Sequence, residues 1–182
     1  MSTVAFFHAH PDDEAIFTGG TMARLKALGH RVVLILATGG ELGNDTSTPE
    51  PLLSRRMAET HESADGLGVD SLLFLGFHDS GMQGDPSNDD PESFWSAETN
   101  AAAESLARIL LDESVDSLVN YDPNGIYGHP DHIKCHQVGT LAAGLARISS
   151  TYEMTVDREY LHFVETHLVT EAALSGDLGL AG

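Results

Sequence analysis

The sequence VAFFHA at residues 4–9 runs directly into HPDDE at residues 10–14, and this junction decides the fold. Residues 4–9 form a short apolar run, typical of a buried parallel strand. A second junction of the same kind lies far downstream, where the apolar run at 117–121 leads through a turn-rich segment to HPDH at residues 129–132. Each junction therefore places metal-capable side chains shortly after a predicted strand.

The rest of the chain alternates between short apolar runs and helical patterns. Strands are expected at residues 4–9, 31–37, 71–75, 117–121 and 151–156, and helices at 12–28, 51–67, 97–113, 129–148 and 157–174. This alternation predicts an α/β fold, a Rossmann-like parallel sheet with helices on both faces. At 182 residues the chain is most simply one domain spanning residues 1–182.

Four loops are expected to meet at one edge of this sheet, because sites in such folds lie outside the carboxyl ends of the strands. The loops are residues 10–14, 38–43, 76–82 and 122–132, and each follows a predicted strand. The segment from residue 76 to 91 is also too long for a routine connection, and long loops in compact domains are often functional. This convergence is the main sequence argument for a site.

The two motifs have the spacing of metal ligands. Residues three apart share a face on a helical turn, so His10 with Asp13, and His129 with His132, could each direct two ligands to one place. Such a set suits a catalytic zinc site of the His₂-carboxylate type, and it also suits Fe²⁺. Simpler explanations exist: acids complement the dipole at a helix start, and a lone histidine is often merely packed or exposed.

Composition excludes several classes of protein. Nine basic residues against twenty-eight acidic ones give a formal charge of −19, which argues against nucleic acid and anionic membrane surfaces as partners. The turn after the first strand lacks G-x-G-x-x-G, and no P-loop motif occurs, which argues against a dinucleotide enzyme. No signal peptide or membrane span is recognisable, so a cytoplasmic protein is expected. The single Cys135 is interpreted as a packed helix residue, with a thiolate ligand as the alternative.

Together the two motifs resemble the LmbE-like or PIG-L family of zinc-dependent N-acetylglucosaminyl deacetylases. The stretch Arg56-x-x-Glu59, followed by Leu67-Gly68-Val69, is similar to the second helix of that family. The stretches DSGM at 79–82 and YDPNGIYG at 121–128 resemble the branch that includes the mycothiol-pathway deacetylase and the mycothiol S-conjugate amidase. The resemblance covers nearly all of the chain.

The resemblance implies roles at both motifs. His10, Asp13 and His132 become the metal ligands, and Asp12 becomes the general base. His129 becomes the electrophilic group that stabilises the oxyanion.

Further roles follow for residues around the motifs. The resemblance implies that Tyr127 assists His129, and that Asp131 orients His129 and favours its protonated form. Arg56 and Asp79 match positions that hold sugar hydroxyls. Without the resemblance, Arg56 could equally form a surface ion pair with Glu59.

Other residues near the motifs keep two interpretations. Glu41 either lines the mouth of the site or has no role. His8 is expected to be structural, or to support the site from behind.

The resulting hypothesis is a metal-dependent hydrolase that removes the acetyl group from an N-acetylglucosaminyl conjugate, a small-molecule amino sugar. The alternatives are an amidase acting on another amide, such as a mycothiol S-conjugate, and a metal-binding module without turnover. Family members commonly continue into a C-terminal segment that closes over the substrate, and neither His162 nor His167 matches that segment. A homo-oligomer, in which a partner subunit completes the pocket, is therefore a further hypothesis.

Overall fold

The computed structural model describes residues 1–43 and 51–163. Five parallel strands form one sheet in the order β3-β2-β1-β4-β5. The strands are β1 (Thr3–His8), β2 (Arg31–Thr38), β3 (Ser71–Phe77), β4 (Ser117–Tyr121) and β5 (Ser150–Met154). The expected α/β fold with a parallel sheet is confirmed.

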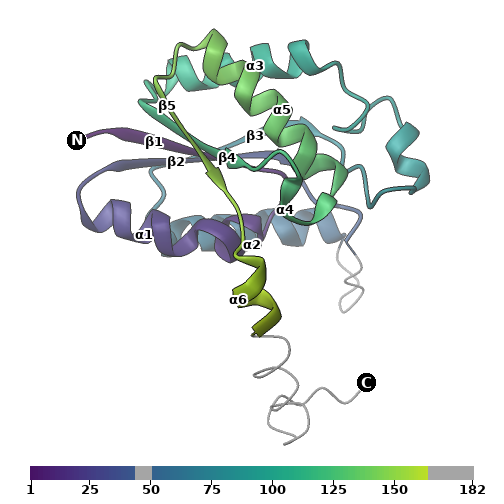
Figure 1. The fold of residues 1–182 in the computed structure, drawn as a ribbon, viewed down its shortest axis with the longest axis horizontal. Coiled ribbons are helices and arrows are strands. Elements are labelled where there is room, and N and C mark those ends of the chain that lie inside the picture. The colour runs from purple at the N-terminus through teal and green to yellow at the C-terminus, as the bar shows by residue number, and fades with distance from the viewer. Residues whose placement is uncertain (44–50, 164–182) are drawn as a thin grey trace, which may run out of the picture.

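Helices cover both faces of the sheet. Helices α1 and α2 lie on one face, and α3 and α5 lie on the other (Figure 1). The helices are α1 (Gly19–Ala27), α2 (Leu52–Leu67), α3 (Thr99–Asp112), α4 (Gly125–Gly128), α5 (Pro130–Leu145) and α6 (Arg158–Phe163). A π-helical turn (Glu14–Thr18) precedes α1, and a 3₁₀ turn (Pro86–Asp89) precedes α3.

The two faces follow from the period of two along a strand. In β1, Ala5 and Phe7 pack in the cluster that includes α3 and α5, whereas Val4 and Phe6 pack with Met22 of α1 on the opposite face. Both faces of the central strands are therefore buried, which explains why these strands read as continuous apolar runs. Burial of each large apolar side chain contributes about 1.5–3 kcal/mol.

The expected single helix over residues 12–28 is wrong in its first half. The chain forms the π-helical turn first and begins α1 only at Gly19. The wider winding of a π turn shifts the phase of the side chains. The prediction of one continuous helix rested on the helical spacing of apolar residues that include Ile16 and Met22. Ile16 is exposed, whereas Met22 is fully buried.

Other expected elements differ in their limits, most clearly in the second half of the chain. The expected helix over 129–148 runs from Pro130 to Leu145 and is preceded by the short α4 in a segment expected to be loop. The expected strand over 151–156 is Ser150–Met154. The expected helix over 157–174 is represented by α6, and its residues from 164 onward lie outside the described part of the chain.

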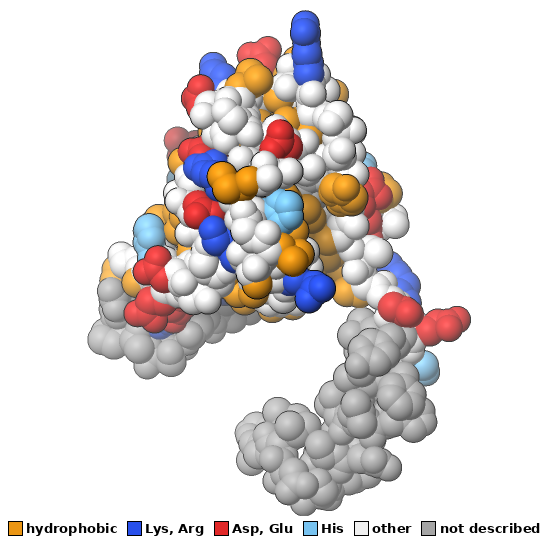
Figure 2. All heavy atoms as spheres, turned by 90° about the vertical axis from the view of Figure 1, so that its left-hand side faces the viewer, with side chains coloured by type: hydrophobic (Ala, Val, Ile, Leu, Met, Phe, Trp, Pro, Cys, Tyr) orange, Lys and Arg blue, Asp and Glu red, His pale blue; other side chains and the backbone are white. Residues whose placement is uncertain are grey.

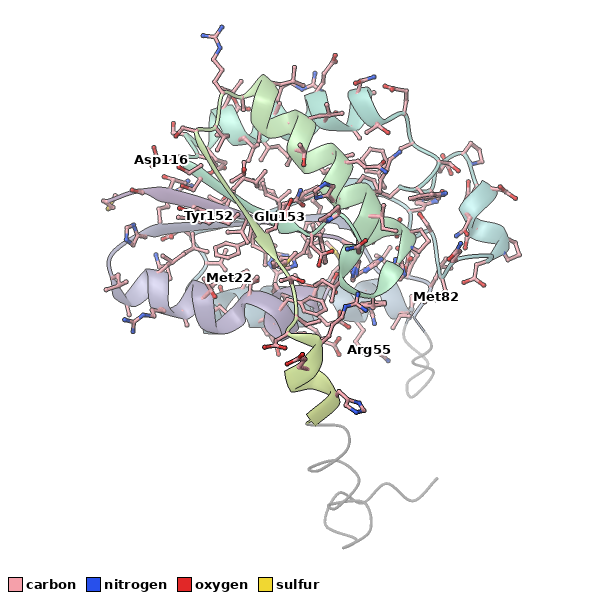
Figure 3. All side chains as sticks on the ribbon, viewed as in Figure 1. Met22, Arg55, Met82, Asp116, Tyr152 and Glu153 are labelled. Carbon is pink, nitrogen blue, oxygen red and sulfur yellow. The ribbon has the colours of Figure 1, made fainter. Side chains whose placement is uncertain are left out.

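All strands of the parallel sheet begin on one side of the molecule and end on the other. Met82 lies on the side where the strands end, and Asp116 lies on the opposite side, where β4 begins (Figure 3). The face at the beginning of the strands carries Lys and Arg side chains among acidic and apolar ones (Figure 2). Among the described helices, none has the length and apolar character needed to cross a bilayer.

Candidate metal centre and active site

The first arm of the site is the sharp turn that follows β1. Asp12 has a φ of +96°, in the left-handed region that a non-glycine residue rarely adopts. The buried Glu14 holds this turn, because its carboxylate accepts hydrogen bonds from the Asp12 backbone N–H at 3.0 Å and from the Ser63 hydroxyl of α2 at 2.6 Å. Strain of this kind clusters at functional sites.

The second arm is the junction of α4 and α5. His129 caps the N-terminus of α5, with Pro130 at the first helical position, and His132 lies on the first turn. Gly125 permits this approach: its φ is +59°, and a Cβ on it would lie 2.7 Å from the Cβ of His132. The backbone is therefore built to bring the α4 turn against His132.

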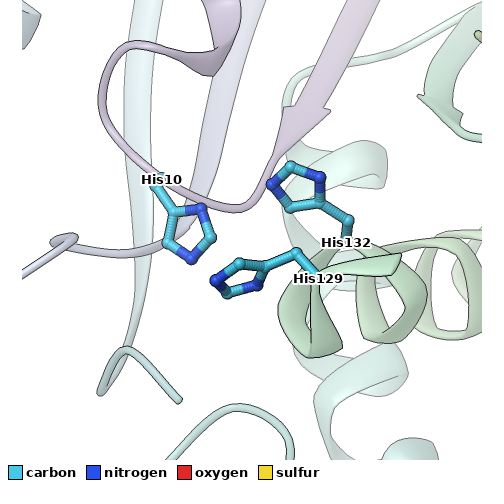
Figure 4. A group of neighbouring side chains, drawn as sticks. All are labelled: His10, His129 and His132. Carbon is cyan, nitrogen blue, oxygen red and sulfur yellow. The ribbon is translucent and has the colours of Figure 1, made fainter. Parts of the chain in front are cut away.

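The two arms meet, and three imidazoles converge between them (Figure 4). His10, His129 and His132 are buried and offer nitrogen atoms that lie within 4.8 Å of one another. Oδ2 of Asp13 lies 3.3 Å from Nδ1 of His10 and 3.3 Å from Nε2 of His132. The residues predicted as ligands are thus side by side, with His129 next to them.

The protonation pattern of these side chains fits a divalent cation. Nδ1 of His132 lies 3.3 Å from the carbonyl oxygen of Gly125, to which it can donate, leaving Nε2 as a lone pair. Within the described residues, this Nε2 is buried and has no hydrogen-bond partner. A lone pair and a carboxylate oxygen repel each other at close range, and a cation between them removes that repulsion. The donor set of two nitrogens and one carboxylate oxygen is that of a catalytic zinc site.

His10 lies between two carboxylates. Its Nε2 lies 3.1 Å from Oδ2 of Asp131 and its Nδ1 lies 3.3 Å from Oδ2 of Asp13, so both nitrogens can donate when no cation is bound, and a cation would replace the proton on Nδ1. Burial alone would lower the pKa of His10, but contacts with Asp13, Asp131 and Asp79 raise it well above 6.5. A carboxylate behind a histidine is the usual support of a metal ligand.

The expectation that the Asp131 carboxylate orients His129 is wrong. Residues two apart do not face each other on a helical turn, and the Asp131 side chain points to His10 and to Ser80. The backbone N–H of Asp131 donates to Nδ1 of His129 instead, at 3.2 Å.

His129 is consequently a neutral donor. Since its Nδ1 accepts a hydrogen bond, the proton of the neutral ring lies on Nε2. Burial, followed by the nearby His10 and His132, lowers the pKa of His129 to about 4. The expected protonated form is therefore not favoured, and the ring presents an N–H group rather than a ligand lone pair.

An open pocket of about 400 Å³ lies in front of the imidazoles. His132 and Asp131 are fully buried and are not among the lining residues. The lining includes seven of the nine site residues predicted from the sequence: His10, Asp12, Asp13, Arg56, Asp79, Tyr127 and His129.

The predicted base and Arg56 face each other in this pocket. Nη2 of Arg56 lies 3.4 Å from Oδ2 of Asp12, and Arg55, not Arg56, is the residue that lies near Glu59, at 3.6 Å. Burial and the charge of Asp13 raise the pKa of Asp12, whereas the hydrogen bond with His10 holds the pKa of Asp13 well below its usual value against the effect of burial. The pKa values of the two adjacent carboxyl groups are thus shifted in opposite directions.

Asp79 and Glu41 connect the loop after β3 with the loop after β2. Oδ1 of Asp79 accepts a hydrogen bond from the Gly81 N–H at 2.9 Å, and Glu41 accepts one from the Asp79 N–H at 2.9 Å. Burial alone would raise the pKa of Asp79, but His10 and the Gly81 N–H lower it to about 2. Asp79 therefore presents a fixed anionic edge to the pocket, and Glu41 holds the loop that carries it.

Sequence reasoning missed two residues of the site. Ser80 donates to Asp131 through both its N–H and its hydroxyl, and Tyr121 donates to Asp13 at 2.7 Å. The position of Tyr121 at the end of a predicted strand was the signal that could have found it. Cys135 packs in the core on α5, and burial raises the pKa of its thiol, which argues against a thiolate ligand.

Comparison with known proteins places this chain among related sequences. The sequence model of the GlcNAc-PI de-N-acetylase (PIG-L) family matches residues 5–143. The 1D-myo-inositol 2-acetamido-2-deoxy-alpha-D-glucopyranoside deacetylase 2 of Catenulispora acidiphila is 45% identical over 153 residues, which are 76% of this chain and 50% of that protein. The 1D-myo-inositol 2-acetamido-2-deoxy-alpha-D-glucopyranoside deacetylase of Acidothermus cellulolyticus is 40% identical over 173 residues, which are 87% of this chain and 59% of that protein.

Solved structures show the same fold. The N,N'-diacetylchitobiose deacetylase of Pyrococcus horikoshii superposes with a TM-score of 0.64 at 27% identity, covering 79% of this chain and 49% of that chain. The conserved protein TT1542 of Thermus thermophilus gives a TM-score of 0.66 at 25% identity, covering 87% and 68%. The chain spans about half the length of the first of these curated relatives.

Proposed function

Because this chain belongs to the PIG-L family of GlcNAc-PI de-N-acetylases, we propose that it is a zinc-dependent N-deacetylase that releases acetate from an N-acetylglucosaminyl conjugate. One observation carries the proposal: the buried Nε2 of His132 has no hydrogen-bond partner among the described residues and faces Asp13 at 3.3 Å. His10, Asp13 and His132 would hold the ion.

Bound zinc would supply a water molecule with a pKa of about 7 and would polarise the amide carbonyl. Fe²⁺ is compatible with the same donor set. The chain itself must then move one proton and stabilise one developing negative charge.

Asp12 is the residue placed to move the proton. It lies at the pocket surface beside the ligands, and its raised pKa brings it closer to the working pH of a general base. Asp12 would take a proton from the attacking water and return it to the departing amine. The products would be acetate and a free amino sugar.

His129 would meet the developing oxyanion through its Nε2–H, with help from Tyr127. The ring centroids of Tyr127 and His129 lie 6.2 Å apart, and both residues line the pocket. Donors aimed at an oxyanion are typically worth about 10²–10³ in rate each.

The names of the relatives indicate the class of substrate, an acetamido sugar joined to inositol. Arg56 and Asp79 line the same pocket and would hold sugar hydroxyls, the first as a donor and the second as an acceptor. The pocket of about 400 Å³ suits a small conjugate rather than a polymer.

The test is acetate release from N-acetylglucosaminyl-inositol and simple N-acetylglucosaminides, by protein as isolated, after chelation, and after addition of Zn²⁺ or Fe²⁺. We expect metal-restored release in the wild type. Asp12→Asn should retain stoichiometric metal and lose about 10²–10⁴ in kcat. Near wild-type turnover in that variant would refute the role of Asp12, and a protein that binds no metal would refute the site.

A further inference from the structure

Tyr121, the last residue of β4, contacts both arms of the metal centre. Its ring is fully buried and stacks on the His132 imidazole, with ring centroids 4.3 Å apart and an angle of 30° between the planes. Its hydroxyl donates to Oδ2 of Asp13 at 2.7 Å. One side chain thus touches two of the three residues that would hold the ion.

The direction of these hydrogen bonds is fixed by the donors available. An ionised carboxylate can only accept, so the single hydroxyl hydrogen of Tyr121 points to Asp13. The backbone N–H of Ala9 donates to the same hydroxyl at 3.2 Å, and Nδ1 of His8 lies 3.4 Å from it. The remaining ring nitrogen of His8 lies 2.7 Å from the Thr18 hydroxyl. The phenol is therefore held from behind and aimed at Asp13.

The Asp13 carboxylate is restrained from two directions. Its Oδ2 accepts from the His10 backbone N–H at 3.0 Å and from the Tyr121 hydroxyl. These two bonds fix the rotation of the carboxylate and keep Oδ2 at 3.3 Å from both ligand nitrogens. Without the phenol hydroxyl, one of the two restraints on Asp13 is lost, and the backbone N–H of Ala9 loses its acceptor as well.

We infer that Tyr121 is a positioning residue for the metal centre, whose hydroxyl orients Asp13 for the ion while its ring holds His132. This inference rests on the proposed function, because it requires that His10, Asp13 and His132 bind metal. Tyr121 contacts neither the pocket surface nor the substrate region, so it acts through its two neighbours.

The test compares Zn²⁺ affinity in the wild type and in Tyr121→Phe, by competition with a chromogenic chelator. The substitution removes only the hydroxyl and keeps the stacked ring. We expect Zn²⁺ binding to weaken about 10–100-fold, the usual effect of removing a group that supports a metal ligand. The unfolding of each metal-free protein in urea is measured in parallel, so that a change in affinity is separated from a change in stability.

The matched control is Thr60→Val, which removes a buried hydroxyl on α2 whose hydrogen bond runs to the Arg56 backbone carbonyl rather than to Asp13, His8 or Tyr121. It should lower the stability of the metal-free protein and leave Zn²⁺ affinity within about threefold of wild type. An affinity in Tyr121→Phe equal to that of the wild type would overturn the inference and leave the proposed function intact. A wild type that binds no Zn²⁺ would overturn both.

A measurement on the wild type alone covers the case in which Tyr121→Phe does not fold. The buried hydroxyl proton of Tyr121 is followed by NMR in protein carrying labelled tyrosine, before and after saturation with Zn²⁺. We expect a clear shift, because the carboxylate that accepts this proton becomes a weaker acceptor once it binds a cation. A hydroxyl resonance that does not move on metal binding would overturn the inference.

Discussion

Replacement of His8 by Gln should remove a large part of the acid sensitivity of the metal-free protein. His8 is fully buried at the end of β1, between the Thr18 hydroxyl and the Tyr121 phenol. Burial lowers its pKa from 6.5 to about 4, against the opposing charge of Asp13. The folded protein therefore keeps this ring neutral over a range in which the unfolded chain takes up a proton.

The sign and size follow from linkage. The contribution of a neutral His8 is fully present above about pH 6.5 and is lost as the pH falls, because the unfolded state then binds more protons than the folded state. The loss in the free energy of unfolding should be about 1 kcal/mol at pH 5.5 and should level off at about 3 kcal/mol below pH 4.

The assay is urea unfolding in the presence of a chelator at pH 7.5, 5.5 and 4.5. The stability advantage of the wild type over His8→Gln should shrink by these amounts as the pH falls. His61→Gln is the matched control, because His61 is exposed on α2 and loses little hydration on folding. Stability curves for wild type and His8→Gln that stay parallel from pH 7.5 to 4.5 would refute the reasoning.

Two further predictions concern the metal centre. Gly125→Ala should weaken Zn²⁺ binding by roughly 10-fold or more and destabilise the fold by about 1–3 kcal/mol, because the new Cβ would lie 2.7 Å from the Cβ of His132. The control is Gly144→Ala, whose new Cβ meets no atom within 4 Å. In the same chelator competition this variant should bind Zn²⁺ as the wild type does. Asp131→Asn should lower Zn²⁺ affinity about 10-fold, because it removes the charge behind Nε2 of His10. Wild-type affinity in either Gly125→Ala or Asp131→Asn would contradict the geometry given for that arm.

The sequence was sufficient to predict the layers and the edge at which the site lies. Alternation within β1 separates Phe6 from Phe7 onto opposite faces, and a period of two is visible without any tertiary information. The meeting of the loop after β1 with the loop after β4 follows from a rule about parallel sheets.

Partners inside the site could not be predicted in the same way. Spacing indicates which residues share a helical face, but it does not say that Asp131 contacts His10 across 121 positions. The positive φ of Asp12 was equally hidden, because local preference disfavours it and a distant contact between Glu14 and Ser63 stabilises it. The π-helical turn that leaves Ile16 exposed was also missed, because the spacing of apolar residues predicted an uninterrupted helix and π turns are rare.

The long separation between the two arms has a consequence for biosynthesis. His10 and Asp131 lie 121 positions apart, and the pairing of β1 with β4 is what brings their loops together. At ribosomal speeds of about 5–20 residues per second, the first arm waits roughly 6–24 seconds for the second to be made. During that interval the nascent chain displays His10 and its neighbouring acids without their counterpart. Metal capture at the proposed site would therefore have to wait until both arms have been synthesised and β1 has paired with β4.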